Sequence, residues 1–222
     1  MSGEKTIYFV RHGESTFNEW RTRSLWTFSW IFVKDPMIID APLSPKGELQ
    51  VQQLHNEILQ KKLHESIQLV ITSPLTRAIQ TALGGFEGSS IPFQVHASCR
   101  EMLDTACDIG RQPSELAEAF MGKCVDFTSL RDYWWLPTPP ATPMPTPTTP
   151  KDVAPLRETS TEVNRRILEL LRHLNELPEM HIAVVCHSSF IKRATKASRK
   201  LANCEMHAIS LRELQRLHAP SA

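Results

Sequence analysis

The chain has 222 residues, of which 41% are apolar, so it can bury a complete hydrophobic core as one domain. Its 25 basic and 24 acidic residues nearly cancel, which excludes the broad field that attracts nucleic acid or an anionic membrane; any anion specificity must be local. The five cysteines are an odd number without CxxC spacing, which argues against a disulfide framework and a zinc site and favours a reducing compartment.

A β-branched and aromatic run at residues 6–10 predicts a buried strand that ends at Arg11, His12 and Gly13. Ligands of open α/β sheets bind beyond the carboxyl ends of the strands. We therefore expect Arg11 and His12 at a substrate site.

Residues 19–39 are rich in aromatic side chains and show no clean helical or strand period. A lid over the site and an insertion packed on the core both fit this composition, and general burial tendencies favour the packed surface. The aromatic residues concerned are Trp20, Trp26, Phe28, Trp30 and Phe32.

Two helices and a strand are predicted next. Ser44 as N-cap with Pro45 at the first helical position predicts a helix over 45–63. A second strand is predicted at 67–72, followed by a helix that begins near Pro74. Arg77 then falls in the first turn of that helix and is expected at the same sheet edge as His12.

Residues 91–96 predict a short strand, which Pro92 places at the edge of the sheet. Glu101, just past the end of this strand, is a candidate acid or base, although a single Glu is more often a surface charge. A short helix is predicted over 113–120.

From about residue 136 to 155 proline alternates with small polar residues, which disfavours helix and sheet and predicts an exposed loop of polyproline II character. A ligand segment for SH3-like or WW-like domains is the less favoured alternative to a low-complexity insertion. Trp134 and Trp135, just before the loop, are expected to anchor it on the domain.

The C-terminal third holds the clearest helix signal. Thr159 and Glu162 have the spacing of a capping box, and apolar residues follow at three- and four-residue steps up to Leu177. A buried strand is predicted at 180–186, ending at His187, and a basic helix over 190–201. The tail is expected to hold a strand at 207–211 and then a polar helix or a frayed end.

Arginine and histidine thus follow several predicted strands. Any one of the nine histidines is most often structural, so the combination carries the weight. With these motifs the sequence resembles the histidine phosphatase superfamily, in its phosphoglycerate mutase-like branch. The matching residues are Arg11, His12, Gly13, Glu14, Ser15, Asn18, Asp40, Leu43, Ser44, Gly47, Ser73, Pro74, Leu75, Arg77, Ala78, Thr81, Ala82, Arg100, Glu101 and His187.

The resemblance implies an α/β fold, a three-layer sandwich with a mostly parallel central sheet flanked by helices, as in phosphoglycerate mutases. Residues 1–222 would form a single domain with the Pro/Thr-rich insertion at about 136–155 exposed. The resemblance also implies roles for individual residues. His12 would be the nucleophile and Glu101 the proton donor, and phosphate would be bound by Arg11, Arg77 and His187, with Asn18 assisting and Ser188 as a further candidate.

The chemistry of these residue types supports such roles. A neutral imidazole can attack phosphorus to form a phosphohistidine, while its other nitrogen donates to an acceptor such as a backbone carbonyl. Two guanidinium groups and an imidazolium stabilise the charge of the transferred group. A carboxylic acid beside a phosphate dianion has a raised pKa, which suits Glu101 to protonate the leaving group. We expect no metal and no cofactor, since no HExxH, DxD-type or paired His/Cys spacing accompanies the histidines.

The acceptor of the phosphoryl group is the next question. Mutases of the family carry an Arg-His-Tyr-Gly type stretch after the acidic residue and tend to show Gly-Asn after the second histidine, whereas this chain has Met102 and Leu103, and Ser188 and Ser189. Water needs the least recognition, so we predict a metal-independent phosphatase, a hydrolase of phosphomonoesters, over a phosphoglycerate mutase-type transfer. A catalytically inactive protein-binding scaffold is the least favoured alternative.

The expected partner is a small phosphorylated substrate, not nucleic acid and not a membrane, and a homodimer stays an open alternative. The first five residues carry no apolar core of a signal peptide, and no apolar run is long enough to span a membrane. We therefore expect a cytoplasmic protein. No motif names the substrate.

Overall fold

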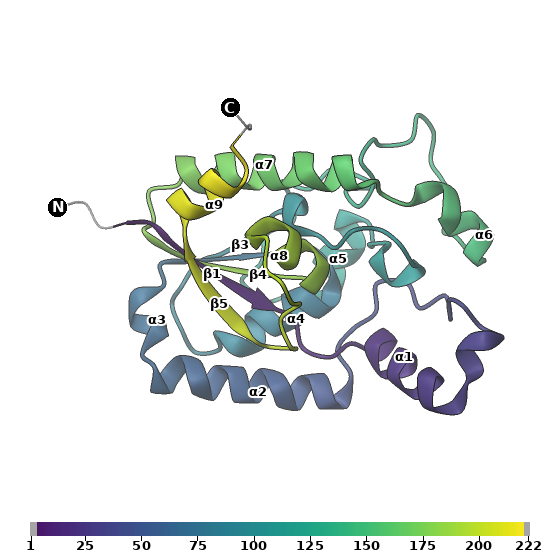
Figure 1. The fold of residues 1–222 in the computed structure, drawn as a ribbon, viewed down its shortest axis with the longest axis horizontal. Helices are drawn as coiled ribbons and strands as arrows, with labels where there is room; N and C mark the ends of the chain where they lie inside the picture. The colour runs from purple at the N-terminus through teal and green to yellow at the C-terminus, as the bar shows by residue number, and fades with distance from the viewer. Residues whose placement is uncertain (1–3, 220–222) are drawn as a thin grey trace.

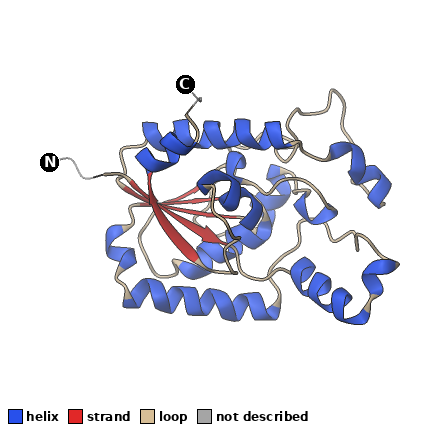
Figure 2. Ribbon diagram, viewed as in Figure 1, coloured by secondary structure: helices blue, strands red, loops and turns tan. Residues whose placement is uncertain are grey.

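The computed structural model describes residues 4–219, which are built around one five-stranded sheet (Figure 2). The strand order is β3-β2-β4-β1-β5. Four strands run parallel, and β5 pairs with β1 in the antiparallel direction. The strands are β1 (Thr6–Arg11), β2 (Leu69–Thr72), β3 (Phe93–Val95), β4 (His181–Cys186) and β5 (Met206–Ser210).

Helices cover both faces of this sheet, with α7 and α9 above it and α2 below it in Figure 1. The α-helices are α1 (Thr16–Thr27), α2 (Pro45–Gln60), α3 (Leu63–Ser66), α4 (Thr76–Gly85), α5 (Pro113–Ala119), α6 (Pro150–Val153), α7 (Ser160–Glu176), α8 (Ser188–Thr195) and α9 (Leu211–Leu217). The expected α/β sandwich with a mostly parallel central sheet is confirmed.

The alternation of side chains along the strands divides the core in two. Ile7 and Phe9 of β1 face the layer of α7, α8 and α9, while Val10 faces α2 and α4, where Leu54 and Ile58 cover it. Successive residues of a strand point to opposite faces, so a strand that is apolar throughout must be covered on both sides. Polar side chains of the sheet are therefore accessible to a ligand only at the ends of its strands.

The helix starts follow the capping residues that the sequence indicates. The hydroxyl of Ser44 accepts a hydrogen bond from the amide of Gly47 at 3.1 Å, with Pro45 at the first position of α2. In α7, the carboxylate of Glu162 accepts from the amide of Thr159 at 2.6 Å, and the Thr159 hydroxyl accepts in return at 3.3 Å. Both predicted caps are confirmed.

Some predicted boundaries are wrong for identifiable reasons. The chain enters the left-handed region at Lys62 and Lys196, so α2 ends at Gln60 and α8 ends at Thr195. Helix α8 also begins earlier than predicted, at Ser188. Helix α4 begins at Thr76 and not at Pro74, because the carboxylate of Asp40 accepts the amide of Thr76 at 2.8 Å and caps the helix from a distant segment.

The Pro/Thr-rich stretch is mostly exposed, but its second half is not free of helix. Helix α6 and the 3-10 helix η4 (Ala154–Leu156) lie within it, and Leu136, Pro147 and Val153 are buried. Trp134 and Trp135 are both buried just before it, and the indole of Trp134 donates to the carbonyl of Arg111 at 2.9 Å. The expectation that these two residues anchor the loop agrees with their burial.

Within residues 4–219, none of the helices combines the length and apolar character needed to cross a membrane.

Candidate active site

His12 lies at the carboxyl end of β1 and is almost fully buried. Its Nδ1 is 2.6 Å from the carbonyl oxygen of Gly13. Because a carbonyl can only accept a hydrogen bond, Nδ1 carries the ring proton and Nε2 keeps a free lone pair. The predicted backbone acceptor for His12 is therefore present.

The loop that follows His12 is held by α4 and by the first turn of α2. The amide of Gly13 donates to the hydroxyl of Thr81 at 3.0 Å, and a carboxylate oxygen of Glu14 accepts from the Ser44 hydroxyl at 3.0 Å. A Cβ atom added to Gly47 would lie 2.0 Å from the carbonyl oxygen of Glu14. Only a glycine allows the helix to approach this closely, so these residues hold the loop in place.

His187 lies at the carboxyl end of β4, and its ring centroid is 5.0 Å from that of His12. Its Nε2 is 2.8 Å from the hydroxyl oxygen of Ser73, which also accepts a hydrogen bond from the amide of Leu75 at 3.3 Å. If the Ser73 hydroxyl donates its proton to Nε2, the ring proton of the neutral imidazole lies on Nδ1. That Nδ1 is buried and has no hydrogen-bond partner in the part of the chain that the structure describes.

The two histidines have similar electrostatic surroundings. Burial, and next the charges of Arg77 and Arg11, hold the pKa of His12 well below its usual value. Burial, followed by Arg77 and His12, lowers the pKa of His187 in the same way. His12 is therefore neutral at pH 7, as a nucleophile must be. The lowered pKa keeps His187 neutral when no ligand is bound, and the expected imidazolium would need a bound phosphate dianion to favour its protonation.

The two arginines differ in how they are held. The Nη1 atom of Arg11 donates to the carbonyl of Leu201 at 2.7 Å, and its Nε is buried without a partner within residues 4–219. The guanidinium of Arg77 donates to the carbonyl of Cys107 at 2.6 Å and to the carboxylate of Asp108 at 2.9 Å. Both groups of the Arg77–Asp108 ion pair are almost fully buried.

Glu101 lies at the same site, but not directly after a strand as predicted, because the 3-10 helix η2 (Ala97–Cys99) separates it from β3. Its carboxylate accepts hydrogen bonds from the amides of Met102 at 3.0 Å and Ser189 at 3.3 Å. Burial raises the pKa of Glu101, and the charge of Asp108 raises it further. The direction suits a proton donor, although it arises from the protein itself and not only from a phosphate.

A buried ion network that sequence reasoning missed holds the backbone around Glu101. Arg166 of α7 donates to the carbonyls of Ser98 at 2.8 Å and Arg100 at 3.0 Å, and to the carboxylate of Glu158 at 2.7 Å. Glu158 also accepts from the guanidinium of Arg100 at 2.6 Å. The signal was present in the sequence, because Arg166 falls on the apolar stripe of its helix.

Asp108 and Ser73 were also missed as site residues. Asp108 ends the 3-10 helix η3 (Ala106–Asp108), where it also forms a local capping box with Thr105, and its pairing with Arg77 spans 31 residues. Ser73 was noted only as part of a motif.

Asn18 and Ser188 complete the predicted set. The side-chain oxygen of Asn18 accepts from the amide of Ser15 at 3.3 Å as part of the cap of α1, which leaves its amide NH2 group as a donor. Ser188 is the first residue of α8 and is buried.

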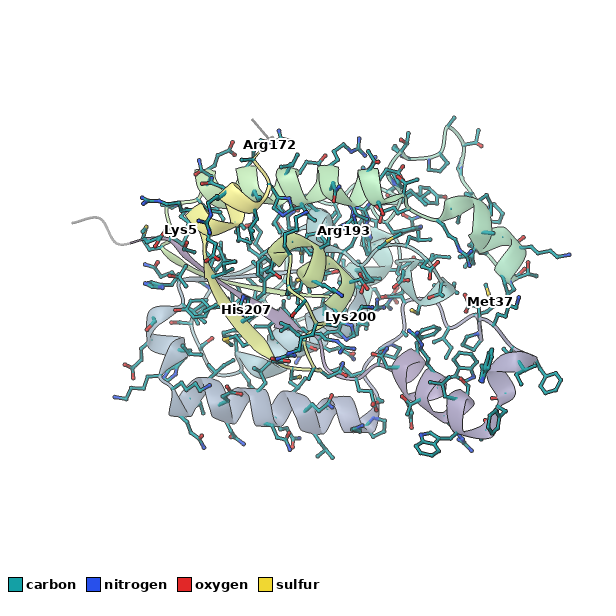
Figure 3. The ribbon with its side chains drawn as sticks, viewed as in Figure 1. Lys5, Met37, Arg172, Arg193, Lys200 and His207 are labelled. Atoms are coloured by element: carbon teal, nitrogen blue, oxygen red, sulfur yellow. The ribbon has the colours of Figure 1, made fainter. Side chains whose placement is uncertain are left out.

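A cavity of about 1290 Å³ brings the predicted residues together. Its lining includes Arg11, His12, Asn18, Arg77, Glu101 and Ser188, and His187 lies beside His12. Lys200, labelled in Figure 3, also lines it. A second cavity of about 400 Å³, beside α5, holds none of these residues.

The aromatic segment forms part of this cavity. The favoured interpretation, a surface packed on the core, is wrong for most of it: Trp26 is 83% exposed and Phe32 is 88% exposed. Trp20 and Trp30 line the cavity instead.

Over residues 4–219 the structure contains no group of three or more His, Cys, Asp or Glu side chains arranged to hold a metal ion.

Comparisons with known proteins agree with this arrangement. The family model of the histidine phosphatase superfamily (branch 1) matches residues 7–218. A phosphoglycerate mutase-like protein of Arabidopsis thaliana is 27% identical over 98% of this chain and 88% of its own length. A Schizosaccharomyces pombe protein named a probable phosphatase is 30% identical over 58% of this chain and 55% of its own length. Among solved structures, the alpha-ribazole phosphatase of Shigella flexneri has a TM-score of 0.55 at 16% identity, over 92% of this chain and 89% of the other.

Proposed function

Because this chain belongs to the histidine phosphatase superfamily, we propose that it is a metal-independent phosphatase that hydrolyses a phosphomonoester through a phosphohistidine on His12. The observation that carries the proposal is the neutral imidazole of His12, whose Nδ1 is held by the Gly13 carbonyl and whose Nε2 is free in a cavity that also contains two arginines. The phosphatase-named relative supports the same class of enzyme.

The reaction follows from the roles of two groups. In the first step, Nε2 of His12 attacks phosphorus, the bond to the ester oxygen breaks, and the leaving alkoxide takes the proton of Glu101. In the second step, the Glu101 carboxylate takes a proton from water, whose oxygen attacks the phosphohistidine and frees His12. The raised pKa of Glu101 favours the protonated form that the first step needs.

Charge on the transferred phosphoryl group is met by donors that have no other partner. The Nε of Arg11 and the Nδ1 of His187 are both buried and unpaired within the described chain, and burial without a partner is costly. A phosphoryl oxygen supplies the acceptors that these donors lack. Arg77 adds a second guanidinium, which Asp108 holds in one orientation.

A phosphoglycerate mutase-type transfer is the second candidate, because the relative of Arabidopsis is named phosphoglycerate mutase-like. Three cations line the cavity beyond the phosphate-binding arginines: Arg21, Lys34 and Lys200. They are available to a substrate carboxylate. Phosphorus NMR with 3-phosphoglycerate and a bisphosphorylated primer separates the two, since a phosphatase releases inorganic phosphate and a mutase forms the isomer.

The nucleophile is tested with p-nitrophenyl phosphate in excess EDTA. We expect wild-type protein to release phosphate and His12→Ala to lose at least about a thousandfold in kcat. The matched control is His207→Ala, at an exposed position of β5 outside the cavity lining, which should keep full activity. Quenching in alkaline detergent should trap a phosphoenzyme that is stable in base and is lost on later treatment with acid. Equal trapping in His12→Ala, or a strict need for a divalent cation, would contradict the proposal.

A further inference from the structure

One wall of the catalytic cavity is formed by α1 and the 3-10 helix η1 (Ser29–Ile31), and most of its lining side chains are apolar. Phe17, Trp20 and Leu25 line the cavity from α1, together with Asn18, Arg21 and Ser24. Trp30 and Ile31 continue the wall from η1. In Figure 1, β1 points toward α1, so this wall stands beyond the strand end that carries His12.

The wall has a fixed inner part and an open outer part. The rings of Phe17 and Trp20 lie 5.8 Å apart and pack with buried neighbours, so they are held in place. Leu25, Trp30 and Ile31 are 56%, 49% and 55% exposed although they line the cavity. Large apolar side chains that stay exposed beside a catalytic group mark a surface that an apolar ligand can cover.

The wall carries two uncharged polar side chains, Asn18, whose NH2 group remains a donor for the phosphate, and Ser24. The hydroxyl of Ser24, which also lines the cavity, donates to the carbonyl of Arg21 at 2.8 Å and is thus already satisfied. The charged members of the same region are cations, Arg21 and Lys34, which favour the approach of a phosphate. Arg21 and Ser24 are interspersed among the apolar side chains of this wall. A sugar or another polyhydroxylated leaving group would find few free partners here, whereas an apolar tail would contact Trp20, Leu25, Trp30 and Ile31.

We infer that the leaving group is apolar and chain-like, so that the substrate is an amphiphilic phosphomonoester. Its phosphate lies at His12, and its tail runs along the wall formed by Trp20, Leu25, Trp30 and Ile31. This inference rests on the proposed phosphatase function and specifies its substrate class.

The test compares kcat/KM for ethyl, butyl, hexyl and octyl phosphate, each below its micelle-forming concentration. Each methylene that leaves water for the wall is expected to raise kcat/KM by about two- to fourfold, so octyl phosphate should exceed ethyl phosphate by at least about fiftyfold. The double variant Trp30→Ala/Ile31→Ala should flatten this dependence, so that the ratio of kcat/KM for octyl phosphate to that for ethyl phosphate falls.

The matched control is Trp26→Ala/Phe32→Ala, which removes two exposed aromatic residues of the same segment that do not line the cavity. This variant should keep the wild-type dependence on chain length. If it loses the dependence as strongly as the cavity variant, adsorption to the outer surface explains the effect and the inference fails.

Two further outcomes separate this inference from the proposed function. If wild-type protein hydrolyses phosphoserine or 3-phosphoglycerate with a higher kcat/KM than octyl phosphate, the apolar tail is refuted while the phosphatase stands. If no ester is hydrolysed, titration calorimetry with ethyl and octyl phosphonate, which cannot be hydrolysed, still measures whether a longer apolar chain binds more tightly to the cavity. Tighter binding of the longer phosphonate would then support the apolar subsite, and equal binding would refute it.

Discussion

Replacing Ser73 by alanine should remove the hydrogen bond that orients the ring proton of His187 and leave the hydrogen bond of the nucleophile, His12, unchanged. The Ser73 hydroxyl oxygen lies 2.8 Å from Nε2 of His187 and accepts from the amide of Leu75 at 3.3 Å, and all of these groups are buried. Without the hydroxyl, nothing holds the ring proton of the neutral imidazole on Nδ1. The donor that the proposed mechanism directs at the phosphoryl group is then present in only part of the molecules.

The magnitude follows from the two hydrogen bonds that are lost. Leaving a buried donor or acceptor unpaired costs about 1–3 kcal/mol, and the longer bond to Leu75 contributes the smaller share, so we expect Ser73→Ala to lower the free energy of unfolding by about 1–3 kcal/mol. If most of this hydrogen-bond energy also stabilises the transition state, its loss lowers kcat/KM by about 10- to 100-fold, since 1.36 kcal/mol corresponds to a factor of ten in rate.

Three measurements separate positioning from stability. Urea unfolding gives the free energy, and phosphate release from p-nitrophenyl phosphate gives kcat/KM. Nitrogen NMR of the His187 ring at pH 7 reports which nitrogen carries the proton. Thr195→Val is the matched control, because it removes a buried hydroxyl that bonds the carbonyl of Ile191 at 2.8 Å at the far end of α8.

The control should lose a comparable amount of stability and keep kcat/KM, while Ser73→Thr, which retains the hydroxyl, should recover the NMR signature of the wild type. The reasoning is refuted if the proton of wild-type His187 resides on Nε2. It is also refuted if Ser73→Ala and the control lower stability equally and both keep full kcat/KM.

Three shorter predictions concern the groups around this centre. Burial and, next, the charge of Asp108 raise the pKa of Glu101, so activity should fall as pH rises through that pKa. Asp108→Asn removes the like charge and should move this basic limb of the pH–kcat profile to lower pH. An unmoved limb would exclude the coupling between Asp108 and Glu101. Arg166→Met should lower the free energy of unfolding by about 3–5 kcal/mol in urea titrations and should reduce kcat. Arg165→Met, at an exposed neighbouring position, should change the free energy of unfolding by less than about 0.5 kcal/mol. Equal effects of the two variants would contradict a stabilising role for the buried network. Gly47→Ala should lower the free energy of unfolding by about 1–3 kcal/mol in the same assay, because the alanine Cβ would lie 2.0 Å from the backbone carbonyl oxygen of Glu14. Alanine favours helix more than glycine does, so a stabilised variant would show that the helix can move away from this oxygen.

Local rules account for what could be predicted. The strand before Arg11, the caps of α2 and α7 and the edge position of β3 were all predictable, because each depends on residues within one or two turns of the chain. The gathering of Arg11, His12 and His187 was predictable as well, since parallel strands present their carboxyl ends at one edge. Some failures arise where a distant group acts, as when Asp40 sets the start of α4, and others where a lysine adopts the left-handed conformation just past the end of α2 or α8.

The sequence by itself determined the buried strands that end at Arg11 and His187 and the caps of α2 and α7, because hydrophobic periodicity, caps and strand ends are local properties. Only the tertiary structure decided the protonation and orientation of the side chains at the site. Ser73 meets the His187 ring across 114 residues, and Asp108 pairs with Arg77 across 31. It also decided that the aromatic segment forms a wall of the cavity, because which face of α1 meets His12 depends on how the helix packs and not on its own composition.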